Sequence, residues 1–292
     1  MKIQSKLFDL HRTLNCGQVF RWTLNEDQWW YGVVRDHIIK IRQVQNELEF
    51  FIYPKMPEPA KFLSHYFRLD DDLEFIYQQI CKDNYMEYAI KNARGLRLIR
   101  QEPWECLISY IISQQNNIPK IKRSIESLSR KFGTPYYIQE KIFHIFPTPA
   151  QLSEANLDEL KRGFKLDGCA LGYRAKYVLK SASLIQNESL SFSLEALKNF
   201  PYKEACKLLQ KTFPGVGPKV ADCILLFSAD KLEAFPVDTW IRRLISKLYS
   251  QKGSIRQIKQ FCTEYFGQFA GYAQEYLFFA AKDFANNFKR NQ

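Results

Sequence analysis

The stretch that decides the fold spans residues 208–244 and reads LLQKTFPGVGPKVADCILLFSADKLEAFPVDTWIRRL. Apolar residues at helical spacing lie on both sides of PGVG, and a proline follows the second glycine. The pattern therefore predicts a helix over about 203–212, a tight hairpin, and a second helix over about 218–229. Taken alone, PGVG is more often an ordinary helix end followed by a proline at a helix start.

The backbone of this hairpin suggests two kinds of ligand. Gly215 and Gly217 flank one apolar residue, which leaves backbone N–H groups open at a helix N-terminus, where they suit a phosphate. A contact between these N–H groups and a phosphate does not depend on the base sequence of the nucleic acid. The loop can also turn its carbonyls outward. Those of Lys211, Phe213 and Val216 would then form a site for a monovalent or divalent cation.

Beyond the hairpin, a lysine and an aspartate are of the types that nucleophilic chemistry requires. Lys219 falls in the first turn of the second helix, where a cation opposes the helix dipole and a neutral amine is favoured. Asp238, nineteen residues further on in PVDTW, is placed to cap the next helix. A surface lysine and a capping aspartate are the simpler interpretations. Either one alone would be preferred to catalysis.

Composition limits the possible partners. The 292 residues are 46% hydrophobic and 15% aromatic, enough for a sizeable core. Lys and Arg number 42 against 31 acidic residues, and the resulting formal charge of +11 favours a polyanion, either nucleic acid or an anionic membrane surface. The chain has no run of 18 apolar residues and no signal-peptide pattern at its start. We therefore expect nucleic acid and no membrane as the partner.

The cysteines indicate the compartment. All seven are widely scattered, and no Cys-x-x-Cys pair is present. This spacing argues against a disulfide framework, a zinc site and an iron–sulfur cluster. It indicates a reducing interior, so we expect a cytoplasmic protein that requires no cofactor.

The N-terminal region has the pattern of an antiparallel sheet. Residues 1 to about 55 are rich in aromatic and branched residues with partial alternation. Strands are expected at 19–22, 29–34, 37–44 and 47–53, with turns at 25–27, 35–36 and 45–46. Three prolines between residues 54 and 59 mark the end of this sheet.

Helical periodicity replaces alternation from about residue 70. Helices are expected at about 73–80, 103–115, 118–132, 149–163, 173–186, 203–212, 218–229, 239–250, 254–265 and 271–287. The sequence therefore predicts an α+β fold. A small N-terminal antiparallel β-sheet domain with a flanking helix, residues 1–95, precedes a mainly α-helical body, residues 96–292.

Several runs in one order carry a resemblance to a family of DNA repair enzymes. Besides residues 208–244, these runs are CGQVFRW at 16–22, RQEPWECL at 100–107, SQQNNI at 113–118, LGYRAKY at 171–177 and YAQEYLF at 272–278. Together they resemble the helix-hairpin-helix, Gly/Pro-Asp superfamily of DNA base-excision glycosylases. Within it the chain looks most like the 8-oxoguanine DNA glycosylases of bacterial type, over most of its length. The resemblance implies a cytoplasmic protein that associates with the nucleoid.

The resemblance implies a mechanism. Lys219 would attack the sugar carbon that bears the oxidised base, release the base and form a Schiff base, from which β-elimination cleaves the strand. Asp238 would stabilise the positive charge that develops on the sugar. The flipped base would lie between Phe278 and Cys223, with Gln274 on its Watson–Crick edge. The Gly17 carbonyl would accept the hydrogen that oxidation places on N7.

The resemblance also implies contacts with double-stranded DNA. Tyr173 would fill the space that the flipped base leaves, and Arg174 would contact the partner base. The asparagines Asn116 and Asn117, with Gln115 beside them, would enter the duplex. A helix start before residue 118 is an equally good interpretation of the asparagines.

Three positions depart from the family pattern. Gln115 stands where eukaryotic members carry asparagine, Lys120 where they carry arginine, and Trp240 where histidine is usual near the target phosphate. The first two positions would read the partner base, so a strict preference for cytosine opposite the lesion is not implied.

Other interpretations have distinct sequence requirements. A non-catalytic hairpin protein that only grips DNA needs neither Lys219 nor Asp238. Relatives that remove oxidised pyrimidines usually carry a four-cysteine cluster near the C-terminus, whereas only Cys262 lies beyond residue 223 here. Alkylpurine glycosylases typically lack the lysine.

The resemblance further implies that the protein acts as a monomer.

Overall fold

Five strands of the N-terminal region form one antiparallel sheet in the order β1-β5-β4-β3-β2. The computed structural model describes residues 1–138 and 140–290. The strands are β1 (Lys2–Gln4), β2 (Trp22–Leu24), β3 (Trp30–Val34), β4 (His37–Val44) and β5 (Glu47–Tyr53). Two-residue turns pair Val34 with His37 and Val44 with Glu47. The predicted sheet and its turns at 35–36 and 45–46 are therefore confirmed.

A short helix interrupts the region that we expected to be β-structure throughout. Helix α1 (Leu10–Asn15) begins at Asp9, whose side chain accepts the Arg12 N–H at 2.7 Å. Leu10 and Leu14, one helical turn apart, are both buried. The expected strand at 19–22 is wrong except for its last residue, because the chain reaches β2 only at Trp22. A six-residue helix is too short to produce a clear periodic signal.

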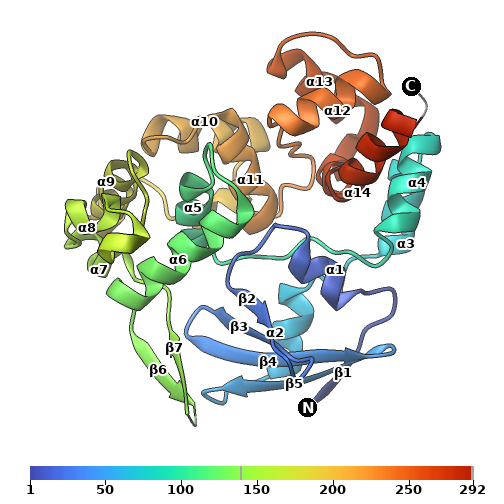
Figure 1. Ribbon diagram of the computed structural model, residues 1–292. Helices are drawn as coiled ribbons and strands as arrows, with labels where there is room; N and C mark the ends of the chain where they lie inside the picture. Colours follow the sequence, from blue (N-terminus) through green and yellow to red (C-terminus); the bar gives the residue numbers. More distant parts are fainter. Residues whose placement is uncertain (139, 291–292) are drawn as a thin grey trace.

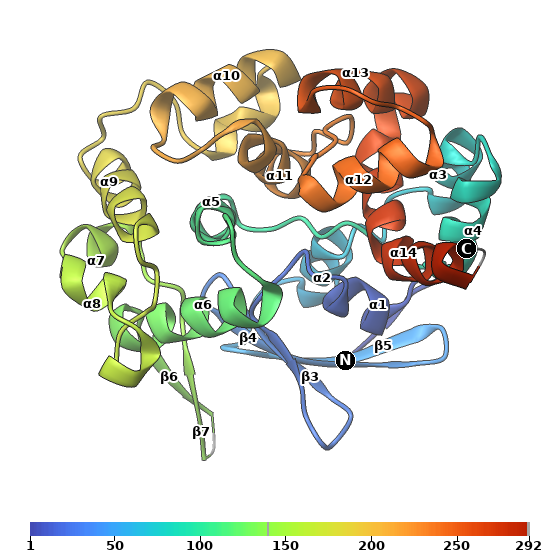
Figure 2. The ribbon, with the colours of Figure 1, turned by 45° about the horizontal axis from the view of Figure 1, so that its top comes forward.

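Two helices separate the sheet from the rest of the molecule. Helix α1 and α2 (Pro59–Tyr66) lie between the sheet and the helical body (Figures 1 and 2). Leu14 and Leu63 are fully buried in one cluster with Ile39, Ile41 and Phe50 of the sheet. This cluster gives the sheet its core on the inner face.

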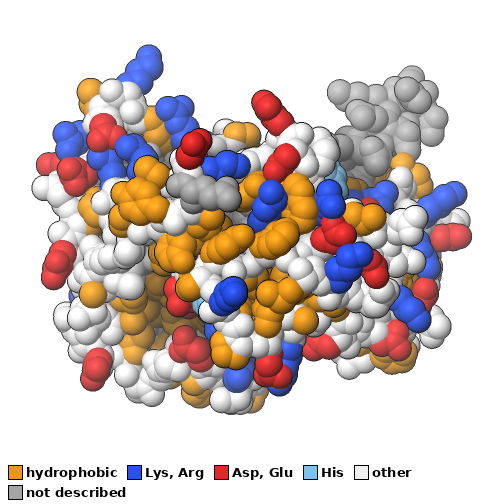
Figure 3. Space-filling view, turned by 90° about the horizontal axis from the view of Figure 1, so that it is seen from below, with side chains coloured by type: hydrophobic (Ala, Val, Ile, Leu, Met, Phe, Trp, Pro, Cys, Tyr) orange, Lys and Arg blue, Asp and Glu red, His pale blue; other side chains and the backbone are white. Residues whose placement is uncertain are grey.

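The outer face of the sheet carries aromatic side chains among paired charges. Phe51 and Tyr53 are exposed there, and the Lys40 and Arg42 cations lie 4.7 and 4.5 Å from the Trp29 ring centroid. Figure 3 views the molecule from this side, where hydrophobic side chains gather at the middle with charges of both signs around them. Such pairs keep aromatic surface in contact with cations rather than with water.

The helical body follows the sheet in the sequence. Its helices are α3 (Leu73–Ile80), α4 (Asn84–Asn92), α5 (Pro103–Ile112), α6 (Ile118–Phe132), α7 (Pro149–Ser153), α8 (Leu157–Lys161), α9 (Arg174–Gln186), α10 (Tyr202–Thr212), α11 (Pro218–Ser228), α12 (Thr239–Leu248), α13 (Ile255–Phe266) and α14 (Ala270–Arg290). Three 3-10 turns lie between them, η1 (Phe164–Leu166), η2 (Glu195–Asn199) and η3 (Gly267–Phe269). Helices α5 and α11 are buried along most of their length. The predicted α+β class is confirmed.

The structure corrects some details of the helical region. The expected helix at 149–163 is two helices, because Asn156 caps α8 and ends the first segment. A hairpin of β6 (Pro135–Ile138) and β7 (Lys141–His144) was not expected, and neither were α2 and α4. Helices α3 and α4 share the core of the helical body rather than that of the sheet. Within the described residues, no helix is long and apolar enough to cross a membrane.

An ionic network around the buried Arg68 joins the segment after α2 to the helical body. The Arg68 guanidinium pairs with Asp230, just beyond the end of α11, and lies 3.8 Å from Asp71. Arg100 pairs with the same two carboxylates, and the Tyr272 hydroxyl of α14 donates to Asp71 at 2.7 Å. Only 1% of the Arg68 residue surface is exposed. Because the charges compensate one another, the two parts of the chain are held in one arrangement.

We expect Arg68→Met to lower the free energy of unfolding by about 3 kcal/mol, because Asp71 and Asp230 lose a buried cationic partner. Urea titration followed by tryptophan fluorescence measures this loss. The control is Arg94→Met, since Arg94 pairs with Glu74 at the surface, and its loss should stay below about 1 kcal/mol. Equal losses in the two variants would contradict the role of the network.

Candidate active site

The predicted hairpin is present between α10 and α11. Gly215 has φ +81°, and a Cβ there would lie 2.4 Å from the Tyr177 ring, so glycine is required on both counts. Gly217 is the N-cap of α11 and supplies no side-chain cap, with Pro218 in the first turn. A hollow of about 600 Å³ lies against residues 210–217. The start of α11 is therefore open to an anion, as the sequence predicts.

The hairpin carbonyls remain a possible cation site. The Phe213 carbonyl accepts the Val216 N–H at 3.2 Å and retains a second lone pair. Across residues 1–138 and 140–290, no group of three or more His, Cys, Asp or Glu side chains could hold a metal ion. A cation at Lys211, Phe213 and Val216 therefore stays a prediction.

Six of the predicted site residues line a single pocket with about 80 Å³ of open space. They are Gly17, Lys219, Cys223, Asp238, Gln274 and Phe278. These residues come from the segment after α1, from α11, from the N-cap of α12 and from α14. The pocket therefore brings together the two residues proposed for chemistry and the four proposed for the base.

Lys219 and Asp238 face this pocket from two helix starts. Asp238 caps α12 by accepting the Ile241 N–H at 2.7 Å, which confirms the capping interpretation. The Lys219 Nζ lies 5.3 Å from the centroid of the Tyr110 ring. The face of an aromatic ring attracts a cation at this distance.

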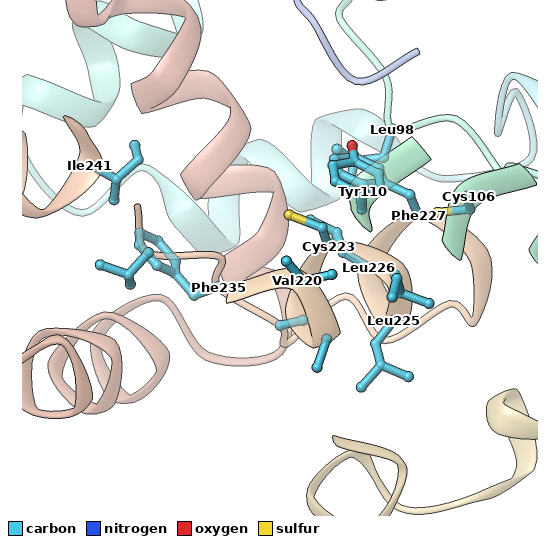
Figure 4. Close-up of a cluster of buried hydrophobic side chains, with 14 of the residues drawn as sticks. Leu98, Cys106, Tyr110, Val220, Cys223, Leu225, Leu226, Phe227, Phe235 and Ile241 are labelled. Carbon is cyan, nitrogen blue, oxygen red and sulfur yellow. The ribbon is translucent and has the colours of Figure 1, made fainter. Parts of the chain in front are cut away.

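Cys223 and aromatic side chains form one wall. Cys223 lies one turn after Lys219 on α11 and is buried, and burial raises the pKa of its thiol to about 11. Figure 4 shows Cys223 beside Tyr110 and Phe227, whose rings stack with centroids 5.6 Å apart. The thiol therefore remains protonated at neutral pH and offers an apolar surface to a flat ligand.

Gly17 brings a strained stretch of backbone to the pocket. Its φ is +106°, and a Cβ would lie 2.7 Å from the side chain of Ile118. Next to it, the buried Gln18 side chain donates to the Thr13 and Arg97 carbonyls, at 2.9 Å each. The geometry admits only glycine at position 17 and holds its peptide group in place.

The loop before α6 is organised by its own asparagines. The Asn117 side chain accepts the Lys120 N–H at 3.0 Å and caps α6, so the helix-start interpretation is confirmed for this residue. Asn116 donates to the Ile112 carbonyl at 3.2 Å. Gln115 and Lys120 are exposed, and Gln115 has φ +46°. The loop thus presents residue 115 at its tip.

Arg174 contacts this loop rather than the solvent. Its guanidinium donates to the carbonyls of Gln114 and Gln115, the latter at 3.1 Å, and the residue is only 6% exposed. Tyr173 and Trp240 are 47% and 42% exposed. Tyr173 is therefore free to meet a ligand, whereas Arg174 is committed to the backbone of the loop in this structure. Its contact with a partner base stays a prediction.

Several pocket residues were not foreseen from the sequence. Gln18, Tyr110 and Glu275 all line the pocket, although each lies inside or close to a run that carries the family resemblance. Glu275 directly follows Gln274, and burial raises the pKa of its carboxyl to about 7. In the sequence, the position of this acidic residue next to Gln274 was the signal that could have placed it in the pocket.

Comparison with protein-family models identifies both halves of the chain. Residues 1–107 match the 8-oxoguanine DNA glycosylase N-terminal domain, and residues 108–268 match the HhH-GPD superfamily of base excision DNA repair proteins. The chain belongs to the 8-oxoguanine DNA glycosylase family. The family predicted from the sequence is therefore confirmed.

Individual members of the glycosylase family resemble this chain over most of its length. A probable N-glycosylase/DNA lyase of Methanothermobacter thermautotrophicus is 32% identical, covering 95% of each chain. The N-glycosylase/DNA lyase of Saccharomyces cerevisiae is 31% identical over 88% of this chain and 72% of its own. The solved Clostridium acetobutylicum 8-oxoguanine glycosylase/lyase, bound to double-stranded DNA with cytosine opposite 8-oxoguanine, is 35% identical with a TM-score of 0.86, covering 98% of each chain.

We expect Gly215→Ala to weaken binding of undamaged and damaged duplex alike. A positive φ costs an alanine ~1–2 kcal/mol. A free hairpin that relaxes to avoid this strain must take it up again on binding DNA, which corresponds to a loss on the order of tenfold in affinity. Fluorescence anisotropy with a labelled duplex at fixed salt measures the change. Gly163→Ala is the control, because Gly163 has φ −69° and its Cβ would meet no atom within 4 Å. Unchanged affinity in Gly215→Ala would exclude the hairpin as a DNA contact.

Proposed function

We propose that this protein removes 8-oxoguanine from duplex DNA and then cleaves the strand, as the first steps of base excision repair. The observation that carries the proposal is the single pocket in which Lys219 and Asp238 meet Gly17 and Gln274. A protein that only grips DNA has no need for an amine and a carboxylate in one enclosed space. The family to which the chain belongs supports the same activity.

The proposed reaction uses Lys219 as the nucleophile. Its Nζ forms a bond to C1′ of the flipped nucleotide, while the bond from C1′ to the base breaks and the base leaves with the electron pair. Asp238, held by its bond to the Ile241 N–H, stabilises the positive charge on the sugar. Loss of a proton from nitrogen and opening of the sugar ring give the Schiff base, and removal of a C2′ proton then expels the 3′ phosphate.

Recognition of the oxidised base follows from the pocket walls. Cys223 and Phe278 would lie against the two faces of the base, and Gln274 would bond its Watson–Crick edge. The Gly17 carbonyl would accept the hydrogen on N7. Because N7 of guanine carries no hydrogen, this one acceptor would separate the damaged base from the normal one.

DNA outside the pocket would be held mainly by its backbone. The open start of α11 at Gly215 and Gly217 would bind a phosphate, with a monovalent or divalent cation on the hairpin carbonyls. Trp240, exposed in the first turn of α12, would lie near the target phosphate. The net charge of +11 would make this binding sensitive to salt.

The gap in the duplex would be filled from two loops. Tyr173 would take the place of the flipped base, and Gln115 to Asn117 would approach the partner base together with Lys120. Arg174 would act there through the loop carbonyls that it holds, or directly after releasing them. We further propose that the protein works as a monomer in the cytoplasm, where its seven free cysteines suit a reducing medium.

Lys219→Gln should abolish the covalent complex that borohydride traps with a duplex containing 8-oxoguanine, while DNA binding persists. Wild-type yields with each of the four bases opposite the lesion would rank the partners. Lys61→Gln, a change of an exposed lysine on α2, serves as the control and should trap normally. No trapping by the wild-type protein on any of these duplexes, with DNA still bound, would favour a non-catalytic hairpin protein or another lesion.

Asp238→Asn separates the catalytic role of this residue from its capping role. Asparagine caps helices as well as aspartate does, so the thermal midpoint should change little. The rate of base release in a single turnover should fall about 10²–10³-fold, because the charge is lost. Asp72→Asn removes the charge from the corresponding cap of α3 and should leave the rate unchanged. Equal rates in Asp238→Asn and the wild type would remove Asp238 from the mechanism.

A further inference from the structure

A buried carboxyl in the pocket has no part in the mechanism described above. Glu275, on α14, is only 4% exposed and lines the pocket together with Lys219. The positive charge of Lys219 acts on this carboxyl, and Cys16, whose thiol donates to the Thr13 carbonyl at 3.3 Å, lies close to it. A carboxyl is rarely buried without a full ionic partner, because its charged form loses hydration. Its place beside the nucleophile therefore requires an explanation.

The thiols and the hydroxyl around Glu275 hold their protons. Burial raises the pKa of the Cys16 thiol and of the Tyr110 hydroxyl well above their ordinary values, and that of Cys223 to about 11. Asp238 has one oxygen committed to the α12 cap. For Glu275 itself, burial raises the pKa to about 7, while the nearby Cys16 thiol and the Lys219 charge lower it. Of the groups whose pKa is raised by burial here, this carboxyl alone changes its protonation near neutral pH.

The proposed attack requires an amine that has lost its third proton. An ammonium has no lone pair for C1′, and a lysine near neutral pH is mostly protonated in water. A proton acceptor inside the pocket is therefore needed, because the flipped nucleotide would close the pocket to solvent.

We propose that Glu275 is the proton acceptor that activates Lys219, taking one proton from Nζ through one water in their shared pocket before the amine attacks the sugar. The step converts an ammonium and a carboxylate into an amine and a carboxylic acid, with no other reactant. The open space of about 80 Å³ is several times the ~10–15 Å³ that one water occupies, so a bridging water fits. The inference rests on the proposed function, since it requires Lys219 to be the nucleophile.

The pH dependence of single-turnover trapping tests this assignment. The wild-type rate should rise through pH 7 as Glu275 ionises and then level off. Glu275→Gln should lose this step, with a rate at pH 7 lower by about 10²–10⁴-fold. The deficit should shrink towards alkaline pH, where hydroxide takes the proton instead. Glu275→Asp keeps the carboxylate and should retain the rise near neutral pH.

Controls separate proton transfer from packing. Glu105→Gln changes another largely buried carboxyl, paired with Arg21 at 3.2 Å, and should leave the profile unchanged. Thermal unfolding at pH 5.5, where Glu275 is mostly protonated, shows whether each variant folds. If Glu275→Gln does not fold, Glu275→Asp decides alone, and a profile that lacks the rise overturns the proposal.

Other outcomes are equally distinct. An equal loss for Glu275→Gln at every pH would show a structural role only and would overturn the inference, as would an unchanged profile. In both cases the proposed function stands, because the wild-type protein still forms the covalent complex. Failure of the wild-type protein to trap would instead remove the proposed function itself.

Discussion

The pocket depends on one side-chain amide that fixes the segment after α1 to the chain that leads into α5. The Gln18 Nε2 donates to the carbonyls of Thr13 and Arg97, and its Oε1 accepts the Ile99 N–H at 2.8 Å. All of these groups are buried, so each would be left unpaired if the amide were absent. The neighbouring Gly17, with its positive φ, has one orientation as a result. The hydrogen bonds of Gln18 therefore fix the pocket wall at Gly17 that would recognise the base.

The chemical groups of the pocket also serve the fold. Asp238 caps α12, and Gly217 starts α11 just before Lys219, so two helix starts aim a carboxylate and an amine into one space. Glu275 shows the cost of such a site, because burying it opposes its ionisation. The raised pKa links the free energy of unfolding to pH. The contribution of the protonated Glu275 to that free energy is fully present below pH 4.5 and is lost as the pH rises through about 7, because the carboxyl must then be charged inside the protein. Groups that destabilise the folded state in this way are concentrated at the functional sites of proteins.

Local signals predicted the elements that carry the chemistry. The glycines of the hairpin and the proline after it gave the start of α11 correctly, and Thr148 forms the capping box that begins α7. The shorter elements were missed. Helix α1 has six residues, and the β6–β7 hairpin has four residues in each strand, so neither repeats its pattern often enough to be recognised. The break at Asn156 was overlooked because the apolar spacing continues on both sides of it.

The sequence by itself determined the hairpin, the positions of Lys219 and Asp238, and the family, because these depend on residues close together in the chain. Only the tertiary structure decided that Gln18, Tyr110 and Glu275 share a pocket with them, since these residues lie on elements far apart in sequence. It also decided that Arg174 holds the carbonyls of the loop at Gln115. Burial and long-range hydrogen bonds depend on packing among distant elements, and no local pattern of residues records that packing.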